Sequence, residues 1–351
     1  KILKDGGTPI LMSHLGRPKR NDPEFSLSHI VKDIERVLGV KVKFTNEVLG
    51  EKTTTVVKKS GPGEIVLLEN LRFCPEEKNG DLKFAEELSK LGDSYVNDAF
   101  GTAHRAHAST SIIASFFPKN KFAGELLLKE VESIHKVMNT GKKPVLGILG
   151  GAKVSSKITI INNIMDKVDK LIIGGGMAFT FIKAQGGQIG DSICEDDKTS
   201  LALSILEKAK EKKVEIYLPN DVVCANEFSN EAKTQICPIN NIPSGWQGMD
   251  AGPSSLSNFE EAIMSSKTIL WNGPVGVFEM ENFSKGTIEL GEYISKSTKL
   301  GAFSLVGGGD SVAAVKQFNF QNKVSYVSTG GGAMLESLEG KTLPGIKALT
   351  Q

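Results

Sequence analysis

Short apolar segments that alternate with helical patterns constrain the fold of this chain more than any other feature. Segments of three to five residues rich in Val, Ile and Leu, which are typical of buried strands, recur along the sequence. We predict strands over residues 9–13, 40–44, 64–68, 94–97, 145–149, 171–173, 214–218, 268–271, 303–306 and 324–327. Helical patterns, such as those at 28–38 and 81–91, lie between them. This alternation predicts an α/β protein whose mostly parallel sheets are covered by helices on both faces.

The length of the chain predicts two domains, because 351 residues exceed the size at which a single core usually keeps growing. Apolar residues at helical spacing over 124–139 are followed by Gly141 and Pro144, and then by a predicted strand. A helix that ends in this way is typical of a connector between domains. We therefore expect two doubly wound, Rossmann-like domains joined by a hinge helix.

Composition excludes several classes of protein. A net charge of +1 argues against a nucleic-acid-binding or membrane-surface protein held by bulk electrostatics, so we expect neither partner. The four cysteines are scattered without a CxxC pair, which argues against a disulfide framework or a zinc site. No apolar run approaches the length of a membrane span, and the N-terminus shows no signal-peptide pattern.

Glycines gather at the ends of predicted strands, where α/β sheets bind ligands. The stretch 145–157 begins as an apolar strand, passes through Gly150 and Gly151, and carries Lys153 and Lys157. We predict that it turns into a helix on which the two lysines, four residues apart, share one face. Free backbone amides, glycines and two lysines favour a phosphate-binding site. The alternative is an ordinary strand–helix turn with solvated lysines.

Three predicted strands of the first half each precede an arginine. His14 and Arg17 follow the first of these strands, Arg72 follows the second, and Arg105 follows the third. All five arginines of the chain lie within its first 105 residues, whereas every other basic residue except histidine is a lysine. Arginine and histidine converging on one sheet edge suit a substrate that bears phosphate and carboxylate. Surface ion pairs are the alternative for each residue taken singly.

The second half carries further glycine-rich loops. A loop that follows Trp271 and Asn272 ends in Glu279, whose carboxylate could hold ribose hydroxyls. Gly307, Gly308 and Gly309 place Asp310 and Ser311 at a predicted helix start, where Asp310 either holds Mg²⁺ or caps the helix. Residues 174–176 with Met177 and Phe179 offer a flat apolar wall for a base, although core packing explains them nearly as well.

Eight motifs together resemble the phosphoglycerate kinase family. They are SHLGRP, ENLRF, NDAFGTAHRAH, GGAKVSSK, IIGGGMAF, WNGPVGVFE, GGGDS and STGGGAMLESLEGK, and they occur in the family's order over essentially the whole chain. The resemblance implies a triose-phosphate-binding domain at 1–123, an interdomain helix at 124–141, a nucleotide-binding domain at 142–334, and a segment at 335–351 that returns to the first domain. It also implies a cytoplasmic, monomeric glycolytic enzyme. The reaction would be a reversible Mg²⁺-dependent phosphoryl transfer between 1,3-bisphosphoglycerate and ADP that gives 3-phosphoglycerate and ATP.

The resemblance also assigns residues to roles. It places His14, Arg17, Arg72 and Arg105 at the triose, and Lys153 and Lys157 at the transferring phosphoryl group. The residues it implies for the nucleotide are Gly151, Lys157, Gly174, Gly175, Gly252, Asn272, Pro274, Glu279, Gly308, Gly309, Asp310 and Ser311. Asp310 is also the implied ligand of Mg²⁺, which would accompany ATP or ADP. The family usually has threonine where Ser311 stands, and the hydroxyl is retained.

The start of the chain departs from the family. Members begin with a strand, an Asp-x-Asn substrate loop and a catalytic arginine, none of which this sequence contains. We therefore expect that the chain starts beyond them, that the first strand of its first domain is missing, and that its catalysis is impaired. A non-catalytic protein that binds Mg-nucleotide is one alternative function. A nicotinamide oxidoreductase is another, although the GxGxxG motif of that class is absent.

Overall fold

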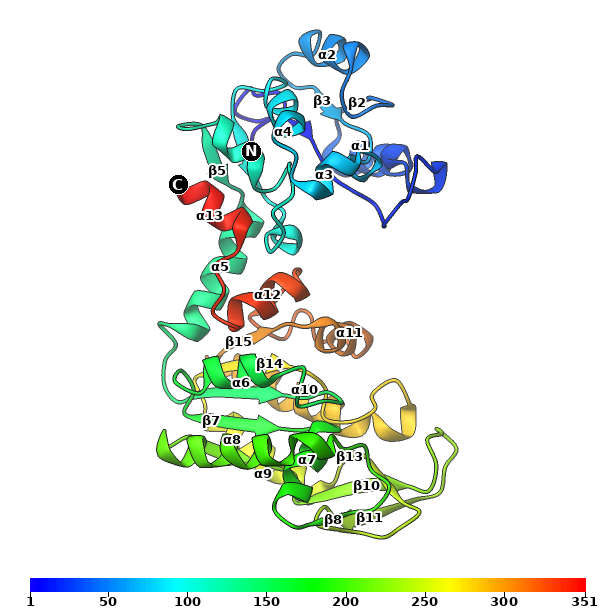
Figure 1. Ribbon diagram of the computed structural model, residues 1–351, viewed down its shortest axis with the longest axis vertical. Coiled ribbons are helices and arrows are strands. Elements are labelled where there is room, and N and C mark those ends of the chain that lie inside the picture. Colours follow the sequence, from blue (N-terminus) through cyan, green and yellow to red (C-terminus); the bar gives the residue numbers. More distant parts are fainter. The chain divides into compact units, whose positions relative to one another are not determined.

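The computed structural model describes all residues from Lys1 to Gln351 and divides into two compact units (Figure 1). Unit 1 comprises Lys1–Leu128 and Thr342–Gln351, and unit 2 comprises Lys129–Lys341. The chain passes from the first unit to the second within helix α5 (Glu125–Met138). The domain limits predicted above, with a separate connector at 124–141, stay a prediction. None of the helices combines the length and the apolar character that crossing a membrane requires.

Unit 1 contains two small parallel sheets. Its strands are β1 (Ile10–Leu11), β2 (Val42–Phe44), β3 (Ile65–Leu67), β4 (Tyr95–Asn97) and β5 (Lys121–Ala123). Its helices are α1 (Val31–Leu38), α2 (Glu51–Lys58), α3 (Pro75–Asn79), α4 (Leu82–Ser89) and α13 (Pro344–Thr350). The strand order is β1-β3-β2 in one sheet, while β4 pairs only with β5. The four strands predicted for this part of the chain are confirmed, whereas β5 was not predicted.

The core of unit 1 forms between β3 and α4. Val66 and Leu68 are fully buried and pack in one cluster with Phe84 and Leu88 of α4. This happens because β3 is apolar on both faces and α4 presents its apolar side chains on one side. Helix α13, from the C-terminal end of the chain, joins the same unit through a hydrogen bond of 2.8 Å from the Gly345 amide to a carbonyl oxygen of residue 103.

Unit 2 is larger and contains most of the strands. They are β6 (Val145–Leu149), β7 (Lys170–Ile173), β8 (Gln188–Ile189), β9 (Glu215–Tyr217), β10 (Asp221–Ala225), β11 (Thr234–Pro238), β12 (Asn241–Ile242), β13 (Gln247–Ala251), β14 (Thr268–Asn272), β15 (Phe303–Val306) and β16 (Tyr326–Val327). The helices are α6 (Ile158–Ile164), α7 (Met177–Ala184), α8 (Thr199–Glu211), α9 (Pro253–Met264), α10 (Lys285–Lys299), α11 (Gly309–Gln317) and α12 (Gly331–Leu338).

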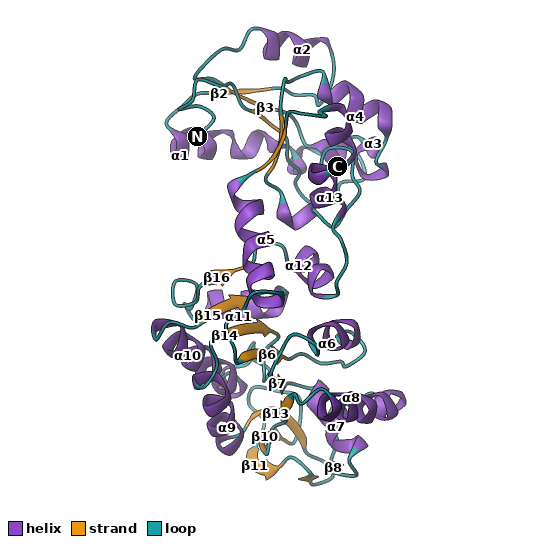
Figure 2. Ribbon diagram, turned by 90° about the vertical axis from the view of Figure 1, so that its left-hand side faces the viewer, coloured by secondary structure: helices purple, strands orange, loops and turns teal.

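Six of these strands form one parallel sheet in the order β16-β15-β14-β6-β7-β9. This is the strand order of a doubly wound Rossmann-like fold, which confirms the predicted fold class. Every residue of β6 and β14 is buried, because helices cover both faces: α9 and α10 lie on one side, and α6, α7 and α8 on the other (Figure 2). Trp271 of β14 and Phe259 of α9 belong to the same buried cluster.

A second sheet of unit 2 was not predicted. Strands β11, β10 and β13 pair antiparallel, and their short segments mix polar with apolar residues. Val222 and Cys224 of β10 pack with Phe179 and Ile182 of α7 in a small core of their own. This sheet therefore sits beside helix α7, near the loops that follow the parallel strands.

Candidate functional site

Two glycines mark the point in unit 2 where the strand order reverses. Strands β6 and β14 are neighbours in the parallel sheet, and the chain proceeds outward from them on either side. Ligands of such sheets bind outside the carboxyl ends of the strands at this switch point. Gly150 follows β6 and Gly273 follows β14, and a Cβ atom at either glycine would overlap the backbone of the opposite loop. The two loops can approach this closely only because both residues are glycine.

A cavity of about 410 Å³ opens among the loops that follow the parallel strands. Five of the residues predicted to bind nucleotide line it, and they come from the loops after β6, β7, β14 and β15: Gly151, Gly175, Pro274, Glu279 and Asp310. A volume of this size is typical of a small-molecule site. The structure thus brings together glycine loops, a carboxylate and an apolar space at the predicted edge of the sheet.

The opposite wall of the cavity is apolar and comes largely from the unpredicted sheet. Val222 of β10 and Met249 of β13 line it together with Phe228, which lies in the connection between β10 and β11 and is 64% exposed. Phe179 of α7 also lines the cavity, as the prediction of a flat apolar wall requires. Met177, named with it, is fully buried and does not line the cavity, so core packing explains that residue.

The other residues predicted to bind nucleotide lie around the cavity without lining it: Lys157, Gly174, Gly252, Asn272, Gly308, Gly309 and Ser311. Several of them hold the loops in place. Asn272 donates from its side-chain amide to the Gly307 carbonyl oxygen at 2.7 Å, and its side-chain oxygen accepts a hydrogen bond from the Lys157 ammonium. The buried Ser311 hydroxyl accepts a hydrogen bond from the Gly273 amide. A polar network therefore joins the ends of β14 and β15 to Lys157.

Lys157 is mostly withdrawn from solvent, and burial lowers the pKa of its ammonium, while the nearby Asp310 carboxylate opposes that shift. Asp310 is exposed in the first turn of α11. The N-cap position of this helix is occupied by Gly308, so Asp310 does not cap the helix. An exposed carboxylate that lines the cavity thus lies near a largely buried ammonium outside it. Opposite charges placed in this way suit phosphate groups and a metal ion.

The prediction that Lys153 and Lys157 share one helix face is wrong. Helix α6 begins at Ile158, and both lysines precede it in a turn closed by a hydrogen bond of 2.8 Å from the Lys157 amide to the Val154 carbonyl oxygen. Ser155, which lies between the two lysines, binds the Glu195 carboxylate through its amide and its hydroxyl. Lys153 is exposed in this loop and its ammonium makes no hydrogen bond or ion pair, whereas Lys157 is bound to the sheet.

Asp250 is a buried carboxylate of the cavity wall that sequence reasoning missed. It is 3% exposed and accepts hydrogen bonds from the amides of Ala251 at 2.9 Å and Gly286 at 2.7 Å. Burial raises its pKa to about 7, although the two amides act in the opposite direction. No sequence motif surrounds Asp250, and its environment becomes visible only in the structure, where α10 packs against β13.

The arginines predicted for the triose site gather in unit 1. Arg72 donates a hydrogen bond of 2.6 Å to the Gly16 carbonyl oxygen, and its Nε atom is buried without a partner. Burial lowers the pKa of Arg72, and the positive charges of Arg17 and Arg105 lower it further. Asn70 fixes the adjoining loop by donating to the carbonyl oxygens of residues 15 and 25 at 2.9 and 2.8 Å. Three nearby cations and an unsatisfied buried donor are features that suit an anionic ligand.

Two histidines share this environment. Burial lowers the pKa of His14, with a further contribution from Arg72, and lowers that of His107 to about 4, with contributions from Arg72 and Arg105. Both rings are therefore neutral at physiological pH and can act as hydrogen-bond donors or acceptors. Two buried carboxylates of this unit, Glu77 and Glu69, are hydrogen-bonded to groups other than the arginines. Glu77 accepts from the Ser109 amide and hydroxyl at 3.0 and 2.6 Å, and Glu69 accepts from the amides of residues 27 and 70 at 2.8 and 2.7 Å.

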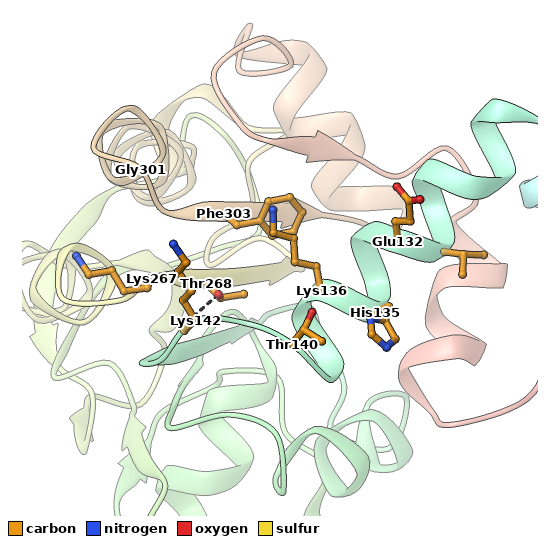
Figure 3. Close-up of a pocket in the computed structure, with 10 residues that line it drawn as sticks. Glu132, His135, Lys136, Thr140, Lys142, Lys267, Thr268, Gly301 and Phe303 are labelled. Carbon is orange, nitrogen blue, oxygen red and sulfur yellow. Dashed lines mark hydrogen bonds between the residues drawn. The ribbon is translucent and has the colours of Figure 1, made fainter.

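A second cavity of unit 2, of about 460 Å³, lies at the other edge of the parallel sheet (Figure 3). Thr268 and Phe303, the first residues of β14 and β15, line it with the last turns of α5. The Lys136 ammonium lies 4.2 Å from the centre of the Phe303 ring, and the Thr268 hydroxyl donates to the Lys142 carbonyl oxygen at 2.9 Å. No predicted site residue lines this cavity, and it lies at the amino ends of the strands. We therefore assign the site to the cavity at the carboxyl ends.

Comparisons with known proteins agree on one family. The family described as phosphoglycerate kinase matches residues 1–341. The phosphoglycerate kinase of Porphyromonas gingivalis is 50% identical, with 99% of this chain and 89% of that protein covered. The cytosolic phosphoglycerate kinase 3 of Arabidopsis thaliana is 47% identical, with 100% of this chain and 87% of that protein covered.

Solved structures give the same result for the fold. The structure of phosphoglycerate kinase from Coxiella burnetii matches with a TM-score of 0.90 and 42% identity, and covers 99% of this chain and 87% of its own. The enzyme from Pyrococcus horikoshii matches with a TM-score of 0.81 and 29% identity over 99% of this chain and 88% of its own.

Proposed function

The chain belongs to the phosphoglycerate kinase family, and from this premise we propose how its two sites divide the family's reaction between them. The enzyme transfers a phosphoryl group reversibly between 1,3-bisphosphoglycerate and ADP in glycolysis, giving 3-phosphoglycerate and ATP. Neither a binding-only function nor a nicotinamide oxidoreductase is supported by the comparisons. Unit 1 takes the triose, unit 2 takes the nucleotide, and lysines of unit 2 act on the phosphoryl group that passes between them.

The triose binds unit 1 through His14, Arg17, Arg72 and Arg105. The repulsion that Arg17 and Arg105 exert on the partly buried Arg72 supports the assignment, because an anionic ligand would relieve it. The planar fork of arginine matches phosphate and carboxylate oxygens, and Arg72 has a buried Nε donor to offer. The neutral His14 ring supplies a further hydrogen bond without adding charge.

The nucleotide binds the 410 Å³ cavity of unit 2. Gly151, Gly174, Gly175 and Gly252 leave room for the adenosine beside the apolar wall, and Glu279 and Pro274 hold the ribose end. Gly308, Gly309, Asp310 and Ser311 receive the phosphates, with Asn272 orienting Lys157. The start of α11 supports this placement, because its first amides have no partners within the helix and carry partial positive charge.

Lys153 and Lys157 neutralise the transferring phosphoryl group. The observation that carries this proposal is the contrast between them: Lys157 is fixed to Asn272, whereas the exposed Lys153 ammonium has no partner in the structure. A cation without a partner is available to the charge that develops during transfer. Lys157 then holds phosphate in both states, and Lys153 acts chiefly in the transition state.

The reaction is a direct transfer. The bond between phosphorus and the carboxyl oxygen of 1,3-bisphosphoglycerate breaks as the bond to the terminal phosphate oxygen of ADP forms. Positioning and charge neutralisation supply most of the catalysis in such reactions. Because the two substrates bind different units and must meet, the helix that joins the units must permit their approach.

Mg²⁺ fits the residues at the cavity rim. Asp310 offers an exposed carboxylate, the hard oxygen ligand that Mg²⁺ prefers. The chain contains no cluster of three or more His, Cys, Asp or Glu that could enclose a metal, so the nucleotide phosphates would provide the other ligands. When bound, the ion would neutralise phosphate charge, while Asp310 orients it beside Lys157.

We also propose that the enzyme acts as a cytoplasmic monomer without nucleic-acid or membrane partners. The near-zero net charge supports the absence of bulk electrostatic attraction to such polyanions. Light scattering after size exclusion measures the oligomeric state, and a dimer mass would contradict the proposal.

Replacement of Lys153 by alanine tests the catalytic assignment. We expect kcat to fall by about 10²-fold or more, since removal of one preorganised charge donor typically costs this much, while the Kd of 3-phosphoglycerate stays within about twofold. A coupled assay measures turnover, and calorimetry measures triose binding. Lys299→Ala, which removes an exposed lysine at the end of α10, is the matched control. Parental kcat in the Lys153 variant would refute the role of Lys153.

A further inference from the structure

The loop that carries Lys153 is tied to a distant acidic residue. The Ser155 amide donates a hydrogen bond of 2.9 Å to the Glu195 carboxylate, and the Ser155 hydroxyl donates a second one to the other carboxylate oxygen. The two residues are 40 positions apart in the sequence. One carboxylate thus holds both polar groups of a single loop residue, which fixes the backbone and the side chain together.

Glu195 is itself held by the helical layer of unit 2. Its amide donates a hydrogen bond of 3.1 Å to the hydroxyl of Thr180, which is 1% exposed in α7. Its carbonyl oxygen accepts from the Lys198 amide at 2.9 Å in the turn that leads into α8. The carboxylate therefore projects from a segment anchored to α7 and α8, and Ser155 is fastened to a rigid support.

The loop is also held at other points: the Val154 side chain is fully buried, and the Gly151 carbonyl oxygen accepts a hydrogen bond of 2.9 Å from the Met177 amide. At one end of the loop the Gly150 amide donates to the Asn272 carbonyl oxygen at 3.0 Å, and at the other end the Lys157 ammonium binds the Asn272 side chain. Lys153 lies between these ends, two residues from Ser155. Without the bond to Glu195, the turn around Lys153 would keep the buried Val154 side chain but would lose the hydrogen bonds that hold Ser155 to the body of the unit.

The charge of Glu195 argues for a geometric role. A carboxylate beside a loop that receives phosphates repels them, so Glu195 would weaken nucleotide binding if charge were its contribution. Its two hydrogen bonds instead hold Ser155 at one place. A displacement of about 1 Å in a catalytic group can cost about 10²-fold in rate, so a tie of this kind can matter more than the repulsion.

We propose that Glu195 is a positioning residue for phosphoryl transfer, which acts through Ser155 to hold the loop that presents Lys153. This inference rests on the proposed catalytic role of Lys153. It predicts that loss of the tie lowers turnover more than it changes nucleotide affinity, because the loop must be placed correctly in the transition state.

Kinetic constants of the full chain test the proposal. We expect Glu195→Ala to lower kcat by about tenfold, with the KM for nucleotide changed less than about threefold. Ser155→Ala should lower kcat similarly, and Ser155→Thr, which keeps the hydroxyl, should recover most of the loss. Asp197→Asn is the matched control, since it removes an exposed acid of the same segment that pairs only with Lys198.

Combined variants separate positioning from a general loss of structure. If Glu195 acts through Ser155, the double variant Glu195→Ala, Ser155→Ala should have the same kcat as Glu195→Ala alone. If the effect reaches the reaction through Lys153, adding Glu195→Ala to Lys153→Ala should lower kcat little further. Parental kcat in Glu195→Ala, or the same cost with and without Lys153, would overturn the proposal. A kcat of Lys153→Ala equal to that of the parent would instead refute the role of Lys153. In that case the kcat of the Ser155 variants would still show whether the Ser155–Glu195 hydrogen bonds position the loop.

Discussion

Asp250 offers a test of the electrostatics of the nucleotide cavity. Its carboxyl group lies between β13 and α10, with hydrogen bonds from the amides of Ala251 and Gly286. Burial raises its pKa to about 7, with a small contribution from Glu289, while the amides and Lys285 lower it. We therefore expect that Asp250→Asn, which removes the titrating group, changes how the stability of unit 2 depends on pH.

The size and sign of this effect follow from proton binding. A carboxyl whose pKa rises from 3.8 to about 7 on folding prefers its proton in the folded chain by about 4 kcal/mol. Between those two values the folded state binds more protons than the unfolded state, so its contribution to the unfolding free energy falls as pH rises. This contribution is complete below pH 4 and is lost as pH rises through 7. The figure of 4 kcal/mol is an upper limit, since solvent relaxation reduces it.

Tryptophan fluorescence measures this stability selectively, because the only two tryptophans, Trp246 and Trp271, both lie in unit 2. Urea unfolding from pH 4.5 to 7.5 should show the unfolding free energy of the parent, relative to that of Asp250→Asn, rising by at most about 3 kcal/mol as the pH falls. Asp191→Asn, at an exposed position, should show no such change. A difference that is constant with pH, or that grows as pH rises, would refute a raised pKa at Asp250.

Two further substitutions test the two sites. Gly150→Ala should destabilise unit 2 by about 3 kcal/mol and abolish ADP binding, because its Cβ would overlap the Pro274 carbonyl oxygen. Urea unfolding measures the stability and calorimetry measures ADP binding. Unchanged ADP affinity would contradict the close approach of the loops. Arg72→Met should raise the KM for 3-phosphoglycerate by at least about tenfold without lowering the Tm, because it removes repulsion from Arg17 and Arg105. A lower Tm with an unchanged KM would show that Arg72 serves the fold instead.

The sequence predicted the parallel sheet of unit 2 well because its strands are buried on both faces. Strands β6 and β15 have the predicted bounds, and most of their residues are apolar and buried. The glycines at the ends of these strands correctly predicted the edge that holds the cavity. Local composition sufficed here because both the strand and the close approach of its loop are properties of adjacent residues.

The antiparallel sheet could not be predicted in the same way. Its strands β11 and β13 mix polar and apolar residues without a clear alternation. Their apolar residues find distant partners: Cys237 of β11 packs with α7, whereas Met249 of β13 packs with Phe283. The cavity wall formed by Val222 and Met249 therefore depends on tertiary contacts, and so does the placement of Phe228 at its rim.

The loop that carries Lys153 shows where a sequence pattern fails and why. The spacing of Lys153 and Lys157 fits a helix, yet α6 begins only at Ile158, and Ser155, between the two lysines, binds a carboxylate 40 residues away. The two lysines consequently differ: one is fixed to the sheet through Asn272 and the other stands free in a tethered loop. A shared helix face would have given them one role, whereas the observed loop allows one lysine to hold phosphate and the other to meet it during transfer.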